Sequence, residues 1–287
     1  MPAPVLIDVN LKDVLTASMC SHLAIEFFKH IAYQRQQLPF PYKQLQSVIR
    51  RKDTLETNAD DQPVDNTSGR TIHRSCQVVQ AETEFKKVKA IMESMQTAFQ
   101  CLEEEICNAN GMVEEVAMIL GATPLSPRDV YRFQYPPLLH GHLDSKHPHQ
   151  SSLLELFRCL ISSEQLHTFF NQPLSPTNMY LFLRKNNTDL VSCGFSPKER
   201  YNIPMSGKHA IIRLMPPTSL PKCICGGTNI FSDKPKDQND SHVEHVIESK
   251  PDEPQGLLWF QAHHTLKGFK DVKINGTSVS TVWLQSR

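Results

Sequence analysis

The residues with the clearest potential for chemistry are two cysteines separated by one residue, Cys223 and Cys225. Thiolates are good zinc ligands, but structural zinc sites usually leave at least two residues between paired cysteines and use further ligands. No second cysteine pair follows, so a complete site would need the fold to bring Cys193 or His209 close. The spacing therefore favours a loop with reduced thiols over a metal site.

Other patterns that could support catalysis are weak or missing. Histidines occur at positions 140, 142, 147 and 149 in a proline-rich stretch, and His242 and His245 lie in a polar segment. Solvated loop histidines are a more natural interpretation than metal ligands in both places. The chain has no glycine-rich phosphate loop, no His-Glu-x-x-His and no nucleophile elbow. We therefore expect no cofactor and no enzyme activity, and a zinc-dependent or other hydrolase is the alternative.

Composition limits the classes of partner. The 30 basic residues are balanced by 30 acidic ones, and the basic cluster Arg50-Arg51-Lys52 is followed at once by acidic residues. Nucleic-acid binding needs clustered cations to neutralise phosphates, so it is not expected. No apolar run approaches the roughly 20 residues that span a bilayer, and the N-terminus lacks a signal pattern. The eight cysteines are then expected to be reduced, in a soluble intracellular protein.

The end of the first expected helix carries an unusual group of polar residues. Leu23, Phe27 and Ile31 recur at four-residue spacing, and Gln34 falls on the same line one turn later. A glutamine there is either a satisfied core amide or part of a partner surface. Spacing alone favours the core.

The pattern of apolar residues predicts several elements. A helix over 19–37 ends before Pro39, because a residue that precedes proline is pushed out of the helical region. A short helix follows over 42–50, and residues 52–78 are polar enough to predict a disordered loop. A three- and four-residue repeat over 85–106 predicts a long amphipathic helix, with a coiled coil as the less favoured alternative.

The second half of the chain mixes helix and strand signals. A strand is expected over 112–120, a helix start at Ser126-Pro127-Arg128-Asp129, and a loop over 136–150. Ser152 and Glu155 form a capping box that opens a helix from residue 153 to about 167, with a wide apolar stripe. Strands are expected over 179–184, 209–215 and 257–262, and a second polar insertion over 228–254. These elements predict an α+β layer architecture.

Several peptides resemble one protein family. The longest runs from His30 through two prolines to Leu45, and two more lie near the C-terminus, Trp259-Phe260-Gln261-Ala262 and Thr265 to Lys270. Shorter matches appear in the same order: Leu120-Gly121 with Leu125-Ser126-Pro127, Leu156-Phe157-Arg158, Pro197-Lys198 with Tyr201, and Gly207-Lys208-His209. Together they resemble the Mad-two-binding family called comet, whose members are adaptors of the spindle checkpoint.

The resemblance implies a HORMA-type fold, in which long helices pack on an antiparallel sheet. It predicts one domain over 14–270 with disordered insertions at 52–78 and 228–254, and a C-terminal extension at 271–287. The family's partner, the mitotic-arrest-deficient-two protein, has the same type of fold.

The resemblance also assigns roles to individual residues. In the comet family a glutamine at the end of the first helix and a phenylalanine on the third contact the partner, and Gln34 and Phe157 match them. Spacing alone places Phe157 in the core, whereas the resemblance places it at the interface. Pro197 and Lys198 match a loop that contacts an AAA+ remodelling ATPase of the Pch-two type. Lys267-Gly268-Phe269 matches the family's tail, which fills the peptide slot of its own fold.

The predicted function is that of a non-catalytic adaptor. It would bind the closed conformer of the mitotic-arrest-deficient-two protein and present it to the ATPase, which disassembles the mitotic checkpoint complex and silences the checkpoint. The resemblance implies a protein of the nucleus and cytoplasm, found at the spindle or kinetochore in mitosis, with no nucleic acid or membrane as partner. A HORMA-like interaction module in another pathway, such as meiotic or repair assembly, is the alternative.

Overall fold

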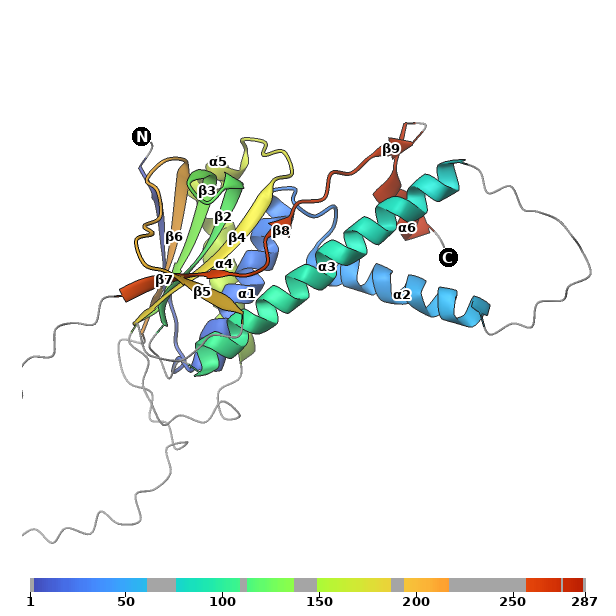
Figure 1. Ribbon diagram of the computed structural model, residues 1–287. Coiled ribbons are helices and arrows are strands. Elements are labelled where there is room, and N and C mark those ends of the chain that lie inside the picture. The colour runs from blue at the N-terminus through green and yellow to red at the C-terminus, as the bar shows by residue number, and fades with distance from the viewer. Residues whose placement is uncertain are drawn as a thin grey trace, which may run out of the picture.

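A mixed β-sheet with helices packed on one face organises the protein (Figure 1). The computed structural model describes residues 3–60, 76–108, 113–136, 149–186, 194–216, 257–274 and 276–285. The main sheet has eight strands: β1 (Val5–Asn10), β2 (Val113–Thr123), β3 (Ser126–Gln134), β4 (Asn178–Asn186), β5 (Phe195–Lys198), β6 (Lys208–Met215), β7 (Leu257–Ala262) and β8 (Leu266–Lys267). The helices are α1 (Ala17–Gln34), α2 (Tyr42–Asp60), α3 (Cys76–Asn108), α4 (His149–Ser162), α5 (Glu164–Phe170) and α6 (Val279–Gln285).

The strand order is β1-β6-β3-β2-β4-β7-β5, and β8 pairs with β4. Most neighbours are antiparallel, but β6 runs parallel to both β1 and β3. The α+β prediction is confirmed. The sheet was predicted to be antiparallel, and it is mostly but not wholly so. The difference arises because β6 enters between β1 and β3 by long connections rather than hairpins, and such connections permit parallel pairing. The arrangement is compatible with a HORMA-like fold.

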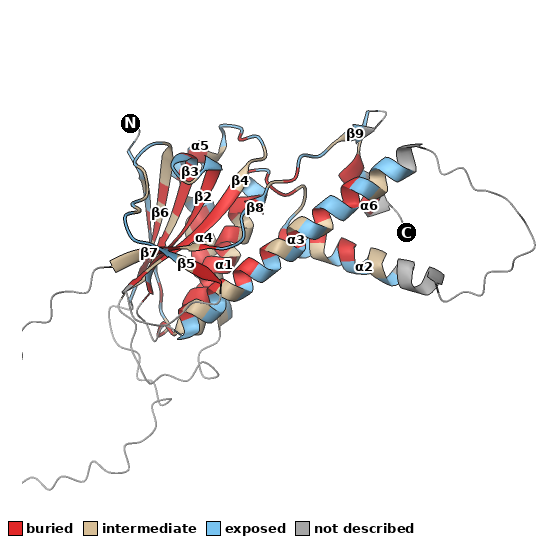
Figure 2. Ribbon diagram, in the orientation of Figure 1, coloured by how far each residue is buried: buried red, intermediate tan, exposed pale blue. Residues whose placement is uncertain are grey.

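Both faces of the central strands are buried, which produces two cores. In β2, Val116, Met118 and Leu120 point to the helices, while Ala117 and Ile119 point to the opposite face, as the two-residue period of a strand requires. Figure 2 shows the buried residues concentrated between the sheet and α1. On the opposite face, the segment after β5 covers the sheet. Tyr201 stacks there on Phe182 of β4, with ring centroids 4.7 Å apart.

The predicted helix start at Ser126 is wrong, because residues 126–134 form β3. Serine followed by proline also marks tight turns, and here it closes the hairpin between β2 and β3. Alternating residues beyond it, Tyr131 and Phe133 on the helix side and Val130 on the other, bury a strand rather than a helix face. Pro127 is tolerated where the β2–β3 register shifts.

The first polar insertion is shorter than predicted. Residues 52–60 continue α2 and residues 76–78 belong to α3; residues 61–75, like the second insertion at 228–254, lie outside the described part of the chain. Contacts between the two helices explain why polar composition misled the prediction. Lys89 pairs with Asp53 at 2.7 Å, and the ammonium of Lys52 lies 4.0 Å from the centre of the Phe85 ring.

The described segments nearest the two ends of the chain pack against the domain. β1 was not predicted and lies before residue 14, although Val5, Ile7 and Val9 alternate as in a half-buried strand. Beyond residue 270, β9 (Lys273–Ile274) and β10 (Thr277–Ser278) form a small hairpin that leads into α6. Trp283 of α6 is 5% exposed and contacts Phe85 and Phe269. The 271–287 extension therefore joins the helical layer through its described residues.

The helix expected from 153 to about 167 is divided into α4 and α5. Ser163 lies between them in extended conformation, and its Oγ accepts a hydrogen bond from the Leu166 N–H, which caps α5. The break lets Leu166 and Phe169 turn into the core.

Candidate partner-binding surface

A buried ion pair fixes the end of α1. Arg35, 2% exposed, donates from Nε to Asp129 on β3 at 2.7 Å, and from Nη1 to the carbonyl oxygens of Phe170 and Gln172. The Tyr131 hydroxyl donates to the same carboxylate at 3.1 Å. Because every charge is paired and hydrogen-bonded, the cluster holds the last turn of α1 in one position.

The residue just before this cluster points the other way. Gln34 is exposed, so the core position that spacing favoured is wrong for it. The line of Leu23, Phe27 and Ile31 is fully buried, but the apolar stripe ends one turn before Gln34. The cluster around Arg35 takes the buried position at the helix end instead.

Helix α4 has apolar side chains on two sides, which explains its wide stripe. Leu156 and Leu160 are buried against the sheet and α1. Leu154 and Ile161 face outward, 51% and 64% exposed. Phe157 lies between the two sides: it is partly buried and packs against the core. This position is intermediate between the core and interface readings of the sequence.

Phe157 and Gln34 are brought together by His30. The rings of His30 and Phe157 meet edge to face with centroids 5.3 Å apart, and Gln34 follows His30 by one helical turn. We call the group His30, Tyr33, Gln34, Leu154, Phe157 and Ile161 the α1–α4 surface. Burial lowers the pKa of His30 below its ordinary value of 6.5, so at neutral pH the ring is uncharged and the centre of the surface carries no charge.

Pro197 and Lys198 lie in a different place. They are exposed residues of β5, which is an edge strand rather than the loop that was predicted. Proline is tolerated at an edge because its missing N–H faces away from the ladder. Since α4 packs against β1, at the other edge of the sheet, the structure does not bring these two residues close to the α1–α4 surface.

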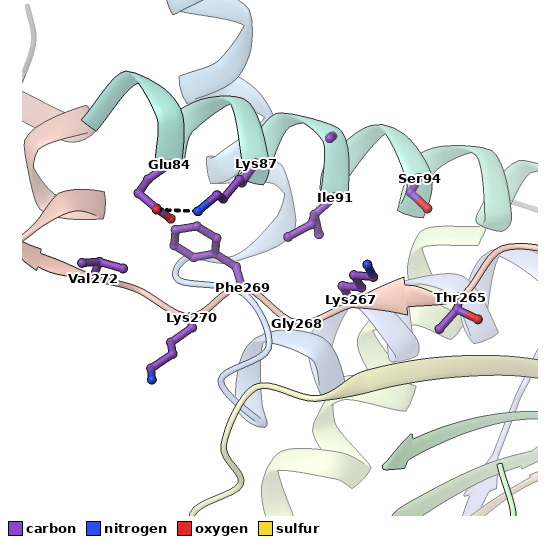
Figure 3. Close-up of a pocket in the computed structure, with 11 residues that line it drawn as sticks. Glu84, Lys87, Ile91, Ser94, Thr265, Lys267, Gly268, Phe269, Lys270 and Val272 are labelled. Carbon is purple, nitrogen blue, oxygen red and sulfur yellow. Dashed lines mark hydrogen bonds and ion pairs between the residues drawn. The ribbon is translucent and has the colours of Figure 1, made fainter. Parts of the chain in front are cut away.

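The predicted tail motif is firmly held. Leu266 and Phe269 are 0% and 4% exposed, and the Phe269 N–H donates to the Gln37 carbonyl oxygen at 2.9 Å. Figure 3 shows Phe269 pointing toward α3. The tail and the α3 residues Glu84, Lys87 and Ile91 line a groove of about 670 Å³ there. The tail therefore packs between α3 and the end of α1.

No other chemistry emerges in the described residues. They contain no group of three or more His, Cys, Asp or Glu side chains placed to hold a metal ion. Cys193, Cys223 and Cys225 lie outside the described residues, so the metal candidate remains untested there. No described helix combines the length and the apolar character needed to cross a membrane.

Comparison with known proteins now bears on the α1–α4 surface. A family model described as "p31comet: Mad1 and Cdc20-bound-Mad2 binding" matches residues 1–223, which include all of this surface. The chain belongs to the p31comet family. The family resemblance predicted from the sequence is thereby confirmed.

Two relatives extend the likeness beyond residue 223. The mouse MAD2L1-binding protein is 25% identical over 266 residues, which cover 93% of this chain and 79% of the relative. The human MAD2L1-binding protein is 25% identical over 274 residues, or 94% of this chain and 82% of the relative. Both are named as binding proteins rather than enzymes. Membership of a Mad2-binding family confirms the prediction of a spindle-checkpoint protein that acts through protein–protein contacts.

Sequence reasoning missed some residues of the α1–α4 surface. His30 and Tyr33 lie in the peptide that carries the p31comet resemblance, but neither was assigned a role. Leu154 and Ile161 were counted in the wide stripe without being assigned to its outer side. Together with Phe157 they follow a three- then four-residue step, which is the signal that would have grouped them on one face.

Proposed function

We propose that this protein binds the closed conformer of the mitotic-arrest-deficient-two protein, Mad2, through the α1–α4 surface. The observation that carries the proposal is that Leu154 and Ile161 are exposed on α4, on either side of the partly buried Phe157, and that Gln34 is exposed on α1. An exposed apolar row next to a polar amide is typical of protein interfaces, where apolar anchors supply affinity and polar groups fix orientation. The p31comet match supports Mad2 as the occupant.

The adaptor role follows from selectivity between conformers. A binder shifts a two-state equilibrium only by the difference of its affinities for the two states. The protein would therefore hold Mad2 closed and compete with open Mad2 for the same surface of the closed form. It would act in the nucleus and cytoplasm and at the spindle or kinetochore in mitosis. We take the fold to be HORMA-like, so that the two partners pair through corresponding helices.

A second partner is proposed at the opposite edge of the sheet. Pro197 and Lys198 would contact the AAA+ ATPase of the Pch-two type, which opens the bound Mad2 and disassembles the mitotic checkpoint complex. Because α4 lies at the β1 edge and these residues lie on β5, the two partners can occupy the protein at the same time. That arrangement is what an adaptor requires.

The tail fills the place of a bound peptide in this proposal. Two backbone hydrogen bonds and two buried side chains, Leu266 and Phe269, hold it against the domain. We propose that no separate peptide binds there, and that the C-terminal residues after 270 reinforce the closure through Trp283.

Size-exclusion co-elution with conformer-locked Mad2 tests the first partner. The wild-type chain should co-elute with closed Mad2 and not with open Mad2, whereas a Gln34→Ala/Phe157→Ala double variant should elute alone. A Lys198→Ala/Pro197→Ala double variant is the matched control, because it lies at the other edge and should still co-elute. Equal binding of both Mad2 conformers would instead favour a HORMA-like module in another pathway.

The same control variant tests the second partner. Recruitment of the ATPase, measured by pull-down in the presence of closed Mad2, should fail for the Pro197/Lys198 variant and persist for one altered in Leu154. Unchanged recruitment by the Pro197/Lys198 variant would remove these residues from the ATPase surface.

A further inference from the structure

A hollow adjoins Gln34 at the end of α1. It measures about 580 Å³ and is lined by the end of α1, the turn after it and the tail: Tyr33, Gln34, Gln36, Leu38, Pro39, Pro176, Phe269, Lys270 and Asp271. Tyr33 is 38% exposed, and Lys270 and Asp271 are exposed. The hollow is thus continuous with the α1–α4 surface, and its far wall comes from residues more than two hundred positions later in the chain.

Backbone geometry holds the two walls together. After α1 the chain turns through Gln36, whose φ of 56° is left-handed, and the Gln37 side chain is fully buried. The Gln37 amide donates to the Arg35 carbonyl oxygen and accepts from the Thr177 N–H, both at 2.7 Å. A side-chain amide satisfied at both ends by the backbone leaves this turn a single arrangement.

The tail is bonded to the same turn. The Phe269 N–H donates to the Gln37 carbonyl oxygen at 2.9 Å, and the Gly268 N–H donates to the Thr177 carbonyl oxygen at 2.8 Å. Gly268 fits too closely for any side chain: a Cβ there would lie 2.4 Å from Gln37 Oε1 and 2.9 Å from the Thr177 nitrogen. We call these four residues, Gln37, Thr177, Gly268 and Phe269, the clasp.

The direction of the tail side chains separates two surfaces. Figure 3 shows Phe269 on the α3 side of the tail and Lys270 on the opposite side. Lys267 lines the groove beside α3 but not the hollow beside Gln34, whereas Lys270 borders both. Neighbouring lysines of one exposed segment therefore differ in whether they face the α1–α4 surface.

We infer that the tail is part of the Mad2-binding surface: Lys270 contacts a polar segment of the bound Mad2, and the clasp positions Gln34 for the same contact. The inference rests on the proposed function. It adds to that function a partner contact from the C-terminal tail and a structural reason why the tail must be docked before Mad2 binds. The occupant is polar because the hollow presents two glutamine amides, a cation and a carboxylate beside its two aromatic rings, Tyr33 and Phe269.

Titration calorimetry of the full chain with closed Mad2 tests the inference. Lys270→Ala should weaken binding by about tenfold, because the inference places it among the minority of interface residues that carry most of the binding energy, without a change in melting temperature. Lys267→Ala, the matched control on the same tail, should bind as the wild type does. Gly268→Ala should weaken binding further, because the added Cβ would clash with the Gln37 side chain and the Thr177 backbone and open the clasp.

A double-mutant cycle separates this inference from the proposed function. If Lys270 and Gln34 contact the same segment, Gln34→Ala with Lys270→Ala should cost at least about threefold less than the product of the two single effects. Loss of binding by Gln34→Ala with wild-type affinity for both Lys270→Ala and Gly268→Ala overturns the inference and leaves the proposed function standing. Wild-type affinity for Gln34→Ala and Phe157→Ala overturns the proposed function, and the inference with it.

Discussion

Truncation of three neighbouring residues on α4 distinguishes an interface role for Phe157 from a core role. Leu156 is fully buried, Phe157 is partly buried and Leu154 is 51% exposed. The three side chains lie on one helix and differ chiefly in the direction they face. Replacing each with alanine therefore compares inward, intermediate and outward positions while the helix itself changes little, since alanine is the best helix former.

The expected stability losses follow from burial. Leu156→Ala removes a core side chain and should cost about 2–5 kcal/mol of unfolding free energy. Phe157→Ala should cost about 2 kcal/mol, roughly half the value for a fully buried phenylalanine, because part of its ring is already in water. Leu154→Ala should change stability by less than about 0.5 kcal/mol. Thermal and urea unfolding measure all three.

The expected affinities do not follow the same order. Truncation of a central aromatic anchor typically costs about 2–4 kcal/mol of binding free energy, so Phe157→Ala should lower the affinity for closed Mad2 about 30- to 1,000-fold. Leu154→Ala should also weaken binding despite its small effect on folding, whereas Leu156→Ala should bind normally at a temperature where it is folded. Biolayer interferometry with immobilised closed Mad2 measures these values. Affinities that simply track stability across the three variants would refute the assignment of Phe157 to the interface.

Three further predictions concern the rest of the fold. Deleting residues 265–287 should lower the urea midpoint by several times the experimental error, because the truncation removes buried tail and α6 side chains; a truncated chain as stable as the wild type would show that the tail does not hold the domain together. Arg35→Met should cost about 3–5 kcal/mol by leaving the Asp129 carboxylate buried and unpaired. Arg213→Ala breaks an exposed pair and should change stability far less; chemical denaturation compares the two variants. Because burial lowers the pKa of His30 in the folded chain, the unfolded chain takes up the proton first on acidification. The contribution of the buried neutral ring to stability is therefore present above pH 6.5 and lost as pH falls through the lowered pKa. His30→Gln should flatten the fall in melting temperature on acidification, and an unchanged dependence of melting temperature on pH would contradict this.

Local sequence signals placed most of the long elements. The stripes of α1 and α3 and the alternation in β6 are strong because one face of each element is buried. The apolar runs of β4 and β7 are strong because both faces of these strands are buried. Signals failed where two meanings compete. Ser126-Pro127 opens helices and also closes hairpins, and the polar residues at 52–60 continue α2 because Asp53 and Lys52 contact α3.

The candidate site was predicted unevenly for a related reason. The resemblance selected Gln34 and Phe157, while spacing alone put both in the core. Periodicity shows which residues share a face of a helix, but it does not show which face another element of the fold covers. On α4, β1 and α1 cover Leu156 and leave Ile161 outside, and that choice depends on how the helices pack.

The sequence by itself determined the family, the α+β class and the peptides that surround the partner surface, since these depend on residue types and short spacings. Only the tertiary structure decided that Gln34 faces solvent, that Pro197 lies at the far edge of the sheet, and that Lys270 borders the same hollow as Gln34. The physical reason is that contacts between residues so distant in the chain are set by packing and by the backbone hydrogen bonds of the clasp. No local pattern records such contacts.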